Sequence, residues 1–379
     1  MVHAIMNISG DQNRGRAHRK QTSVAFWARS YFWLCITYGD IATYGGMEDD
    51  DDDVRPMRPL SCIDVRATSI LWQLAAAKAP LKLGRLVFMI ACSIGMPPQD
   101  VHFFELFAGC GCVTRAQQRR GFIATSMEIE RDQKFEDFNS PHGFLYALLM
   151  ILRLRPGGGC LAAIVCSSWV NLNRGTSGRS VLRPLGNKNV PSVRSGNLQA
   201  SRLCLLLQLM DALKVFWVVE QPAGSLLMHH PRLRIFKTRV PVWKHLVRML
   251  HFGHLARKAT WLYSGHRWIQ EVDHYRLRYH GSAQASHKLY RAGVNNRGVK
   301  TYTANQNTKK SQAYPPAFGR AIARVFDDHH DELKHAAEEW ETSLPHGDAA
   351  RMQAALEMDC HTGWADAELG GIMHMLKRR

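Results

Sequence analysis

The chain has 379 residues, of which 46% are hydrophobic and 21% are charged, a balance typical of a folded protein with a substantial core. No uncharged apolar stretch reaches the roughly 18 residues that a transmembrane helix needs, so we expect no membrane span. Nine irregularly spaced cysteines fit neither a disulfide framework nor a metal-binding pattern. We therefore expect no bound metal and a reducing, intracellular compartment, the nucleus or the cytoplasm, with an organelle as the alternative.

The positive charge is unevenly distributed. The formal net charge is +17, and the first 326 residues carry 44 Lys and Arg against 20 Asp and Glu. So basic a region favours a polyanionic partner, above all nucleic acid. The alternative is a charge that serves only solubility.

Three regions follow from composition and hydrophobic pattern. Residues 1–60 show no sustained period and contain the acidic run Glu48–Asp53, which predicts a disordered extension. Residues 63–326 carry the patterns of a folded domain, beginning with helices over Ala67–Lys78 and Leu83–Ser93. A helical tail is expected over residues 327–379.

A glycine turn follows the first apolar strand of this domain. The run Phe103–Phe107 leads into Gly109 and Gly111, after which a helix-forming segment begins. Glycines let the backbone turn sharply and let a ligand lie against it. A second apolar segment ends at Glu128, whose carboxylate could accept hydrogen bonds from ribose hydroxyls. The order strand, turn, helix, strand and acid predicts a nucleotide-binding α/β unit.

The turn also carries a family resemblance. Glu105–Gly111, which reads Glu-Leu-Phe-Ala-Gly-Cys-Gly, resembles the first motif of the cytosine-C5 DNA methyltransferases, Asp-Leu-Phe-Ala-Gly-x-Gly-Gly, although Cys112 replaces the last glycine. The resemblance implies a Rossmann-type, doubly wound α/β sheet and S-adenosylmethionine as cofactor. The residues that it assigns to the cofactor are Phe107, Ala108, Gly109, Cys110, Gly111, Glu128 and Ile129.

Asp137 has two interpretations. In the family, an acid at the end of a third strand bonds the adenine amino group, and Asp137 is the candidate for that role. The chain between Glu128 and Asp137 is too short for the helix and strand that the family has there. The alternative places Asp137 in a loop before a helix over Gly143–Leu154, which Ser140 would cap ahead of Pro141.

Two further strands end in chemically active residues. Pro156–Gly159 is expected to be a turn, Cys160–Val165 a buried parallel strand, and Cys166 stands at its end. Another apolar strand, Val215–Val219, ends at Glu220. Ligands of open α/β sheets bind outside the carboxyl ends of the strands, so both positions are candidates.

The remaining elements follow in chain order. They are a polar, mobile loop over 167–196, a helix over 197–214, a strand pair over 247–252 and 260–263, and a helix entered at 313–322. Arg174 and Arg179 lie in the polar loop, which is too rich in Gly, Ser, Arg and Asn to pack, and we expect both to bind nucleic acid. A solvated loop without a ligand is the alternative.

The resemblance implies the chemistry at the strand ends. In the family a cysteine thiolate adds to C6 of cytosine while a glutamate interacts with N3. Cys166 and Glu220 are similar in position to these groups, although Val165 replaces the family's proline and Gln221 its asparagine. Lys258 is the one cation at the positions of the family's Gln-x-Arg-x-Arg motif. Neighbouring Arg257 is expected to bind nucleic acid.

These assignments predict methylation of C5 of cytosine in DNA, or in RNA, through a cysteine nucleophile. A structural role is the alternative for the Cys166 thiol and for the Glu220 carboxylate. The short segment between Thr260 and Ala313 leaves little room for a domain that reads a target sequence. The alternative functions are a cofactor-binding relative that lacks catalysis and a non-enzymatic nucleic-acid-binding module.

Overall fold

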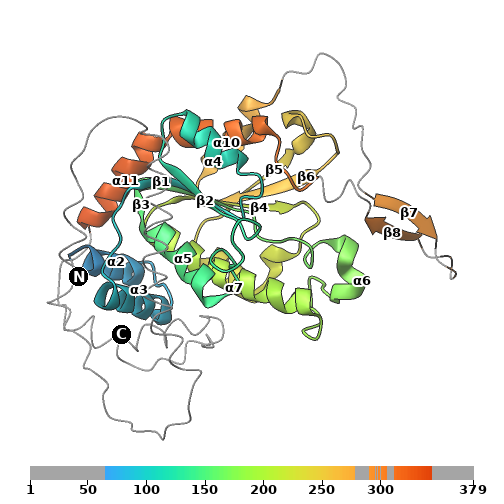
Figure 1. Ribbon diagram of the computed structural model, residues 1–379, viewed down its shortest axis with the longest axis horizontal. Helices are drawn as coiled ribbons and strands as arrows, with labels where there is room; N and C mark the ends of the chain where they lie inside the picture. The colour runs from blue at the N-terminus through green and yellow to red at the C-terminus, as the bar shows by residue number, and fades with distance from the viewer. Residues whose placement is uncertain are drawn as a thin grey trace, which may run out of the picture. The chain divides into compact units, whose positions relative to one another are not determined.

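A mixed six-stranded sheet organises the part of the chain that this computed structural model describes, residues 65–277, 290–294, 296, 298, 300–304 and 311–343. The strands are β1 (Val101–Leu106), β2 (Ala124–Met127), β3 (Leu154–Ala162), β4 (Phe216–Pro222), β5 (Trp243–Arg248) and β6 (Ala259–Ser264). Their order is β2-β1-β3-β4-β6-β5 (Figure 1). Strands β1 to β4 are parallel, and β6 runs antiparallel to both of its neighbours.

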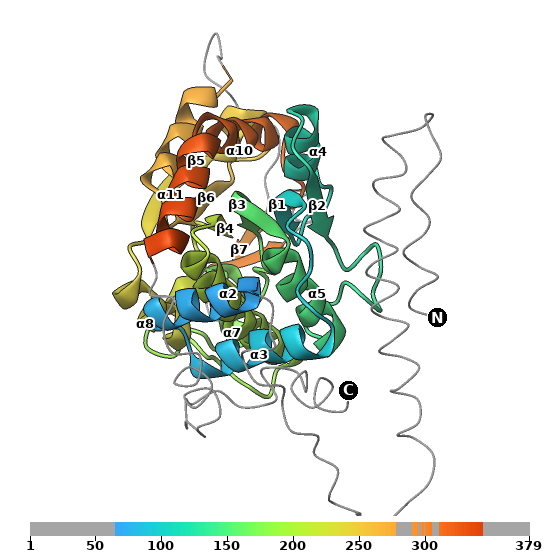
Figure 2. The same cartoon turned by 90° about the vertical axis from the view of Figure 1, so that its left-hand side faces the viewer.

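Helices cover both faces of the sheet (Figure 2). They are α2 (Val65–Ala76), α3 (Leu81–Ser93), α4 (Cys112–Arg119), α5 (Pro141–Leu152), α6 (Arg174–Ser177), α7 (Pro191–Ala212), α8 (Pro231–Arg239), α10 (Pro316–Asp328) and α11 (His330–Ser343). Short 3-10 helices are η4 (Asn171–Asn173), η5 (Leu227–His229), η6 (Met249–Phe252) and η7 (Arg267–Tyr275), and a separate hairpin joins β7 (Tyr290–Val294) to β8 (Lys300–Ala304).

The alternation of side chains along each strand assigns the helices to the two faces. Phe104 and Val219 point into a core shared with α2, α3, α5, α7 and α8, whereas Phe103 and Val218 point into a core shared with α4, α10 and η7. Each fully buried side chain of this size contributes about 1.5–3 kcal/mol. The α/β architecture with a mostly parallel, helix-flanked sheet is therefore as expected, and β6 is the exception to an all-parallel arrangement.

Several expected elements are confirmed with shifted ends. Helices α2, α3 and α10 occur where the apolar periodicity predicts them, and the last strand pair is β5 with β6. Most of Val247–Phe252 is the 3-10 helix η6, so β5 begins and ends earlier than expected. Ser140 caps α5, its hydroxyl accepting from the backbone N–H of Gly143 at 2.9 Å, with Pro141 as the first helical residue.

Two expectations about glycine and polar residues were wrong. The run Pro156–Gly159 lies inside β3, where the register against β1 shifts, and a Cβ on Gly159 would lie 2.7 Å from the ring of Phe103. These glycines therefore serve close packing within a bulged strand. Helix α7 begins at Pro191, six positions before the predicted start at Asn197, so the polar stretch is partly helical and packed. The predicted extension over residues 1–60 and residues 344–379 of the tail lie outside the described ranges.

Candidate active site

The site lies at the carboxyl ends of β1 and β3, where the strand order along the sheet reverses. Strand β1 has β2 on one side and β3 on the other, so the segments that follow β1 and β3 diverge at the same edge. This edge faces the side of the molecule where α6 lies (Figure 1). In open α/β sheets such a switch point forms a crevice that binds ligands. The glycine turn follows β1 there, and the Cys166 segment follows β3.

The glycine turn has the open backbone that its sequence predicts. Phe107, Gly109 and Gly111 have φ values of 61°, 53° and 65°, and Gly111 is the residue that precedes the first turn of α4. A Cβ on Gly109 would have nothing within 4 Å, so there is space beside this part of the turn. Ala108 is buried beneath it, and Cys110 is exposed. The arrangement presents backbone groups to a ligand lying against the turn.

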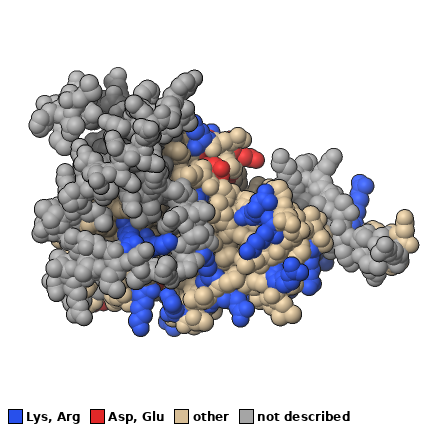
Figure 3. All heavy atoms as spheres, turned by 90° about the horizontal axis from the view of Figure 1, so that it is seen from below, with Lys and Arg blue, Asp and Glu red and all other residues tan. Residues whose placement is uncertain are grey.

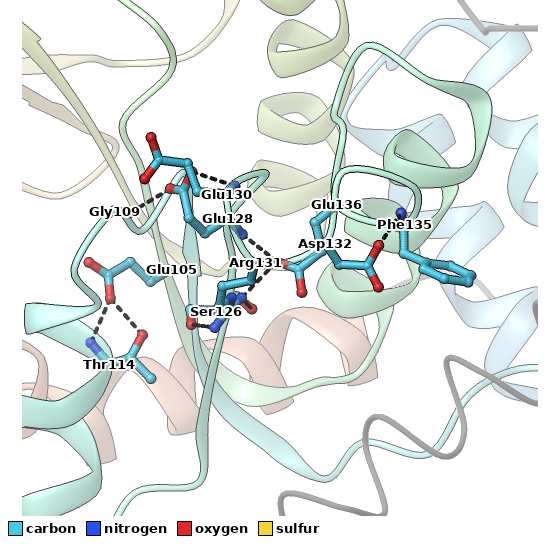
Figure 4. A network of polar contacts seen from close by, with 10 residues as sticks. All are labelled: Glu105, Gly109, Thr114, Ser126, Glu128, Glu130, Arg131, Asp132, Phe135 and Glu136. Atoms are coloured by element: carbon cyan, nitrogen blue, oxygen red, sulfur yellow. Dashed lines mark hydrogen bonds and ion pairs between the residues drawn. The ribbon is translucent and has the colours of Figure 1, made fainter.

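Glu128 lies against the same turn. Its Oε2 accepts a hydrogen bond from the backbone N–H of Gly109 at 2.6 Å (Figure 4). The backbone N–H of Glu128 in turn donates to Glu136, whose carboxylate also accepts from Arg131 at 2.8 Å. Ile129, 39% exposed, follows immediately. The acid at the end of β2 is thus held beside the glycine turn by two residues that the sequence analysis did not single out, Arg131 and Glu136.

Glu105 holds the glycine turn in place through hydrogen bonds to the start of α4. Its side chain is fully buried, and Oε2 accepts from the backbone N–H and the hydroxyl of Thr114 at 2.7 and 2.6 Å (Figure 4). Burial raises the pKa of Glu105, and the two bonds to Thr114 act against that increase. The carboxyl therefore ties the end of β1 to the first turn of α4 and fixes the turn between them.

The segment that carries Cys166 is bound to the end of β4. The backbone carbonyl of Cys166 accepts from Trp169 N–H at 2.9 Å, which forms a turn directly after β3. Gln221 donates from Nε2 to the carbonyl of Ile164 at 2.8 Å and accepts from the Ser225 hydroxyl, also at 2.8 Å. Because Gln221 is the residue after Glu220, this bond holds the thiol segment beside the carboxylate segment.

Glu220, Lys258 and Tyr314 form a buried group at this edge. Glu220 is 5% exposed, and Lys258 Nζ lies 3.5 Å from its Oε1. Lys258 Nζ also lies 5.5 Å from the centre of the Tyr314 ring. Burial raises the pKa of Tyr314 well above its usual value, and the negative charge of Glu220 raises it further. The site thus contains a carboxylate, an ammonium group and a phenol in contact distance of one another.

The charges of this group reach the Cys166 thiol. Burial is the largest cause that raises the pKa of Cys166, the negative charge of Glu220 raises it as well, and the positive charge of Lys258 lowers it. The hydrogen bond from Gln221 to Ile164 holds the segments of Glu220 and Cys166 side by side, and Lys258 lies against Glu220. The structure therefore places Cys166, Glu220 and Lys258, the three residues that the resemblance assigns to catalysis, in one region of the sheet.

The opposed charges around Cys166 give a testable pH dependence. We expect iodoacetamide to alkylate Cys166 with an apparent pKa above the ordinary thiol value of about 8.5, because the thiolate is the reactive form. Glu220→Gln removes the negative neighbour and is expected to lower this pKa, whereas Lys258→Met removes the positive neighbour and raises it. The rate at Cys166 is followed by peptide mass spectrometry between about pH 6.5 and 10.5, about two units either side of the usual value. Identical pH profiles in both variants would contradict the proposed proximity.

The other predicted site residues are more dispersed. The Asp137 carboxylate accepts from the Asn139 N–H at 2.9 Å, and its carbonyl accepts from the Ser140 hydroxyl. Asp137 thus organises the turn before α5, which is the loop interpretation, and the adenine contact stays a prediction. Arg174 and Arg257 are both exposed, as phosphate contacts require.

Arg179 does not fit its expected role. Its side chain is 1% exposed, and its guanidinium donates to Asn197 Oδ1 at 2.8 Å and to Ser168 Oγ at 3.1 Å while it stacks on the Trp169 ring at 3.4 Å. Burial lowers the pKa of Arg179 to about 10. The polar loop therefore folds around this arginine, which packs inside the protein and is withheld from a phosphate on the surface.

Comparison with known proteins adds no assignment: no known protein family matches the chain, and no curated protein sequence is significantly similar to it. Among the described residues, no group of three or more His, Cys, Asp or Glu side chains could hold a metal ion. No helix in the same part of the chain combines the length and the apolar character that crossing a bilayer demands. The functional argument therefore depends on the site itself.

Proposed function

We propose that this protein is an S-adenosylmethionine-dependent methyltransferase that methylates C5 of cytosine in nucleic acid, most simply in DNA, with Cys166 as the nucleophile. The observation that carries the proposal is the convergence of Cys166, Glu220 and Lys258 at the sheet edge that also holds the glycine turn and Glu128. A thiol, a carboxylate and a cation beside a nucleotide-binding turn are the groups that this chemistry needs.

The residues around the glycine turn fit the cofactor. The space beside Gly109 would admit it, and Glu128 stands where it can exchange its bond to Gly109 for bonds to ribose hydroxyls. The partly exposed side chain of Ile129 and the ring of Phe107 offer apolar surface for the adenine. When bound, S-adenosylmethionine supplies an electrophilic methyl group.

Cys166 and Glu220 would activate the base. C5 of cytosine is a weak nucleophile, and addition of the Cys166 thiolate to C6 makes C5 enamine-like while Glu220 shares a proton with N3. A proton on Glu220 would also remove the negative charge that raises the pKa of Cys166. Thiolate formation and protonation at N3 are therefore coupled through one carboxyl group. After transfer, solvent water would take the C5 proton and the C6–S bond would break, which releases the Cys166 thiolate.

Gln221 supports this proposal at the position where the chain departs from the family. The family has a proline before its cysteine, and this chain has Val165. The side-chain amide of Gln221 fixes the carbonyl of Ile164, two positions before Cys166. A hydrogen bond from the neighbouring strand thus constrains the backbone of the nucleophile segment, which a proline would otherwise do.

A mechanism-based trap tests the proposal. Oligonucleotides that contain 5-fluorocytosine cannot release the thiolate, because fluorine replaces the C5 proton. We expect a covalent adduct of the protein with such DNA or RNA that requires S-adenosylmethionine. Cofactor binding without an adduct on any oligonucleotide would favour an inactive relative, and nucleic-acid binding without cofactor affinity would favour a non-enzymatic module. Either outcome would overturn the proposed activity.

The cofactor assignment gives a prediction at Glu128. Hydrogen bonds to a charged group contribute about 1.5–3 kcal/mol, so Glu128→Ala is expected to weaken S-adenosylmethionine binding by roughly 10- to 100-fold in calorimetric titration. The exposed neighbour Glu130, whose backbone N–H donates to Glu128 Oε1 at 3.4 Å (Figure 4), provides the matched control Glu130→Ala, which keeps that backbone bond. Unfolding temperatures of both variants show whether the turn stays folded. Equal affinities in the two variants would place the ribose elsewhere.

A further inference from the structure

Two cysteine side chains meet in the glycine turn. Cys110 and Cys112 flank Gly111, and their Sγ atoms lie 3.2 Å apart. Gly111 has φ 65° and ψ 33°, a left-handed conformation that suits glycine, and both thiols face the carbonyl of Tyr314, at 4.0 and 3.1 Å. Cys112 replaces the last glycine of the family's motif, so the resemblance gives its thiol no role.

The two thiols differ in their access to solvent. Cys110 is exposed, whereas Cys112 is 8% exposed. Burial raises the pKa of Cys112, and the neighbouring Cys110 raises it further, to about 11. Cys112 is therefore a protonated thiol at neutral pH. A reagent in solution meets Cys110 first and finds Cys112 behind it.

Positive charge lies beside this pair. Arg115 donates from Nη1 to the Cys110 carbonyl, and its Nη2 lies 3.7 Å from Cys112 Sγ. On the face seen in Figure 3, Lys and Arg side chains are spread over the described part of the surface while Asp and Glu are sparse, so the wider potential also favours anions. Cysteines that sense oxidants are typically solvent-accessible, in electropositive surroundings and next to a second cysteine. Cys110 meets these three conditions.

We propose that Cys110 and Cys112 form a modification site, at which peroxide produces a reversible disulfide that restrains the glycine turn and weakens cofactor binding. The inference deepens the proposed function, on which it rests for the role of the turn, by adding a regulation of that site. Disulfides inside a reducing compartment are usually transient and redox-sensing, which agrees with the compartment expected from the cysteine pattern.

Hydrogen peroxide is the oxidant of this reaction. The Cys110 thiolate attacks one peroxide oxygen, so that an S–O bond forms, the O–O bond breaks, and the departing hydroxide becomes water with the proton that Cys110 had lost. Cys112 Sγ then attacks Sγ of the Cys110 sulfenic acid. The S–S bond forms, the S–O bond breaks, and the second hydroxide leaves as water with the Cys112 proton. Two thiols are oxidised, and one peroxide is reduced to two waters.

The disulfide changes the site in two ways. It joins the exposed part of the turn to the first residue of α4, so the peptide groups on either side of Gly111 can no longer rotate to meet a ligand. It also removes the S–H donor of the Tyr314 carbonyl, and Tyr314 belongs to the buried group of Glu220 and Lys258. Loss of one hydrogen bond to the cofactor corresponds to an affinity weaker by about two- to tenfold.

Peptide mapping after peroxide treatment tests the site. Trypsin releases residues 86–115 as one peptide that also contains Cys92, so the reference protein is Cys92→Ser. We expect peroxide to remove two hydrogen atoms from the mass of this peptide and dithiothreitol to restore them. In calorimetric titration of the same samples, peroxide is expected to weaken S-adenosylmethionine binding by about two- to tenfold, again reversibly.

The matched control adds Cys112→Ser to the reference protein. Serine keeps a hydroxyl donor for the Tyr314 carbonyl but cannot close the disulfide. Peroxide is expected to leave a sulfenic acid at Cys110, which dimedone traps, and each protein's affinity is compared only with its own value before treatment. For the control we expect that ratio to stay within about twofold.

The readouts separate this site from the methyltransferase proposal. The mass change needs neither cofactor nor nucleic acid, so a disulfide in a protein without cofactor affinity would support the site and refute the proposed function. Adducts with 5-fluorocytosine oligonucleotides are made with the reduced protein and test the activity whether or not the disulfide forms. Sulfinic acid at Cys110 beside a reduced Cys112, a disulfide from Cys110 to Cys166, or an unchanged affinity in the disulfide form would overturn the inference.

Discussion

Replacing Cys166 by serine is expected to abolish the adduct with 5-fluorocytosine DNA and to reduce methyl transfer by at least about 1,000-fold. A serine hydroxyl keeps its proton at neutral pH, and it is a far weaker nucleophile than a thiolate. The measurement is transfer of a radiolabelled methyl group from S-adenosylmethionine together with adduct formation in a denaturing gel.

Two controls make this result specific to the nucleophile. Cofactor affinity of Cys166→Ser, measured by calorimetry, is expected to stay unchanged, because the thiol segment follows β3 and the glycine turn follows β1. Cys92→Ser, on α3 and outside the site, is expected to keep full adduct formation. An adduct that persists in Cys166→Ser and disappears in another cysteine variant would refute the assignment.

Glu220→Gln is expected to reduce the rate of methyl transfer by about 100- to 10,000-fold, the range of general acid–base catalysis. Glutamine keeps the shape and the hydrogen-bonding capacity of the side chain, but it cannot share a proton with N3. Because Glu220 and Lys258 are both largely buried, the single variant also leaves an ammonium group without its partner. We therefore expect a lower unfolding temperature as well as a lower rate.

A double variant separates these two effects. Glu220→Gln with Lys258→Met removes the unpaired charge, and we expect it to recover most of the lost stability without recovering the rate. Unfolding temperature and single-turnover methyl transfer are measured on the same samples. Recovery of both quantities would show that the carboxylate only balances the charge of Lys258 and takes no part in the chemistry.

Much of the fold follows from local sequence, since apolar runs and their periods depend on neighbouring residues. The strand before the glycine turn, Glu128 after the second strand, the Ser140 cap and helix α10 are all of this kind. The turn predicted at Pro156–Gly159 was wrong because glycine has two uses, turning a chain and admitting a close neighbour. Only the position of the Phe103 ring, from another strand, distinguishes them here.

Site residues could be predicted where they follow an apolar run that forms a strand. Residues whose role depends on contacts with distant parts of the chain were harder to predict. Cys166 and Glu220 each follow an apolar run, so their places near the ends of two strands could be predicted, although β3 ends earlier, at Ala162, and β4 extends past Glu220 to Pro222. Tyr314 and Gln221 were missed because their roles come from distant partners, Glu220 and Ile164 respectively. Arg179 was assigned to the surface because its loop is polar, but a loop can fold around one guanidinium group.

The reversed direction of β6 has a consequence for the order of functional residues along the chain. Cys166 and Glu220 come after or at the end of strands that run toward the site, whereas Lys258 comes just before β6, which runs away from it. Pro222 is paired with Thr260, so the start of β6 meets the end of β4. A search for similar sites in unrelated chains should therefore look for the cation upstream of an apolar run and for the thiol and acid downstream of theirs.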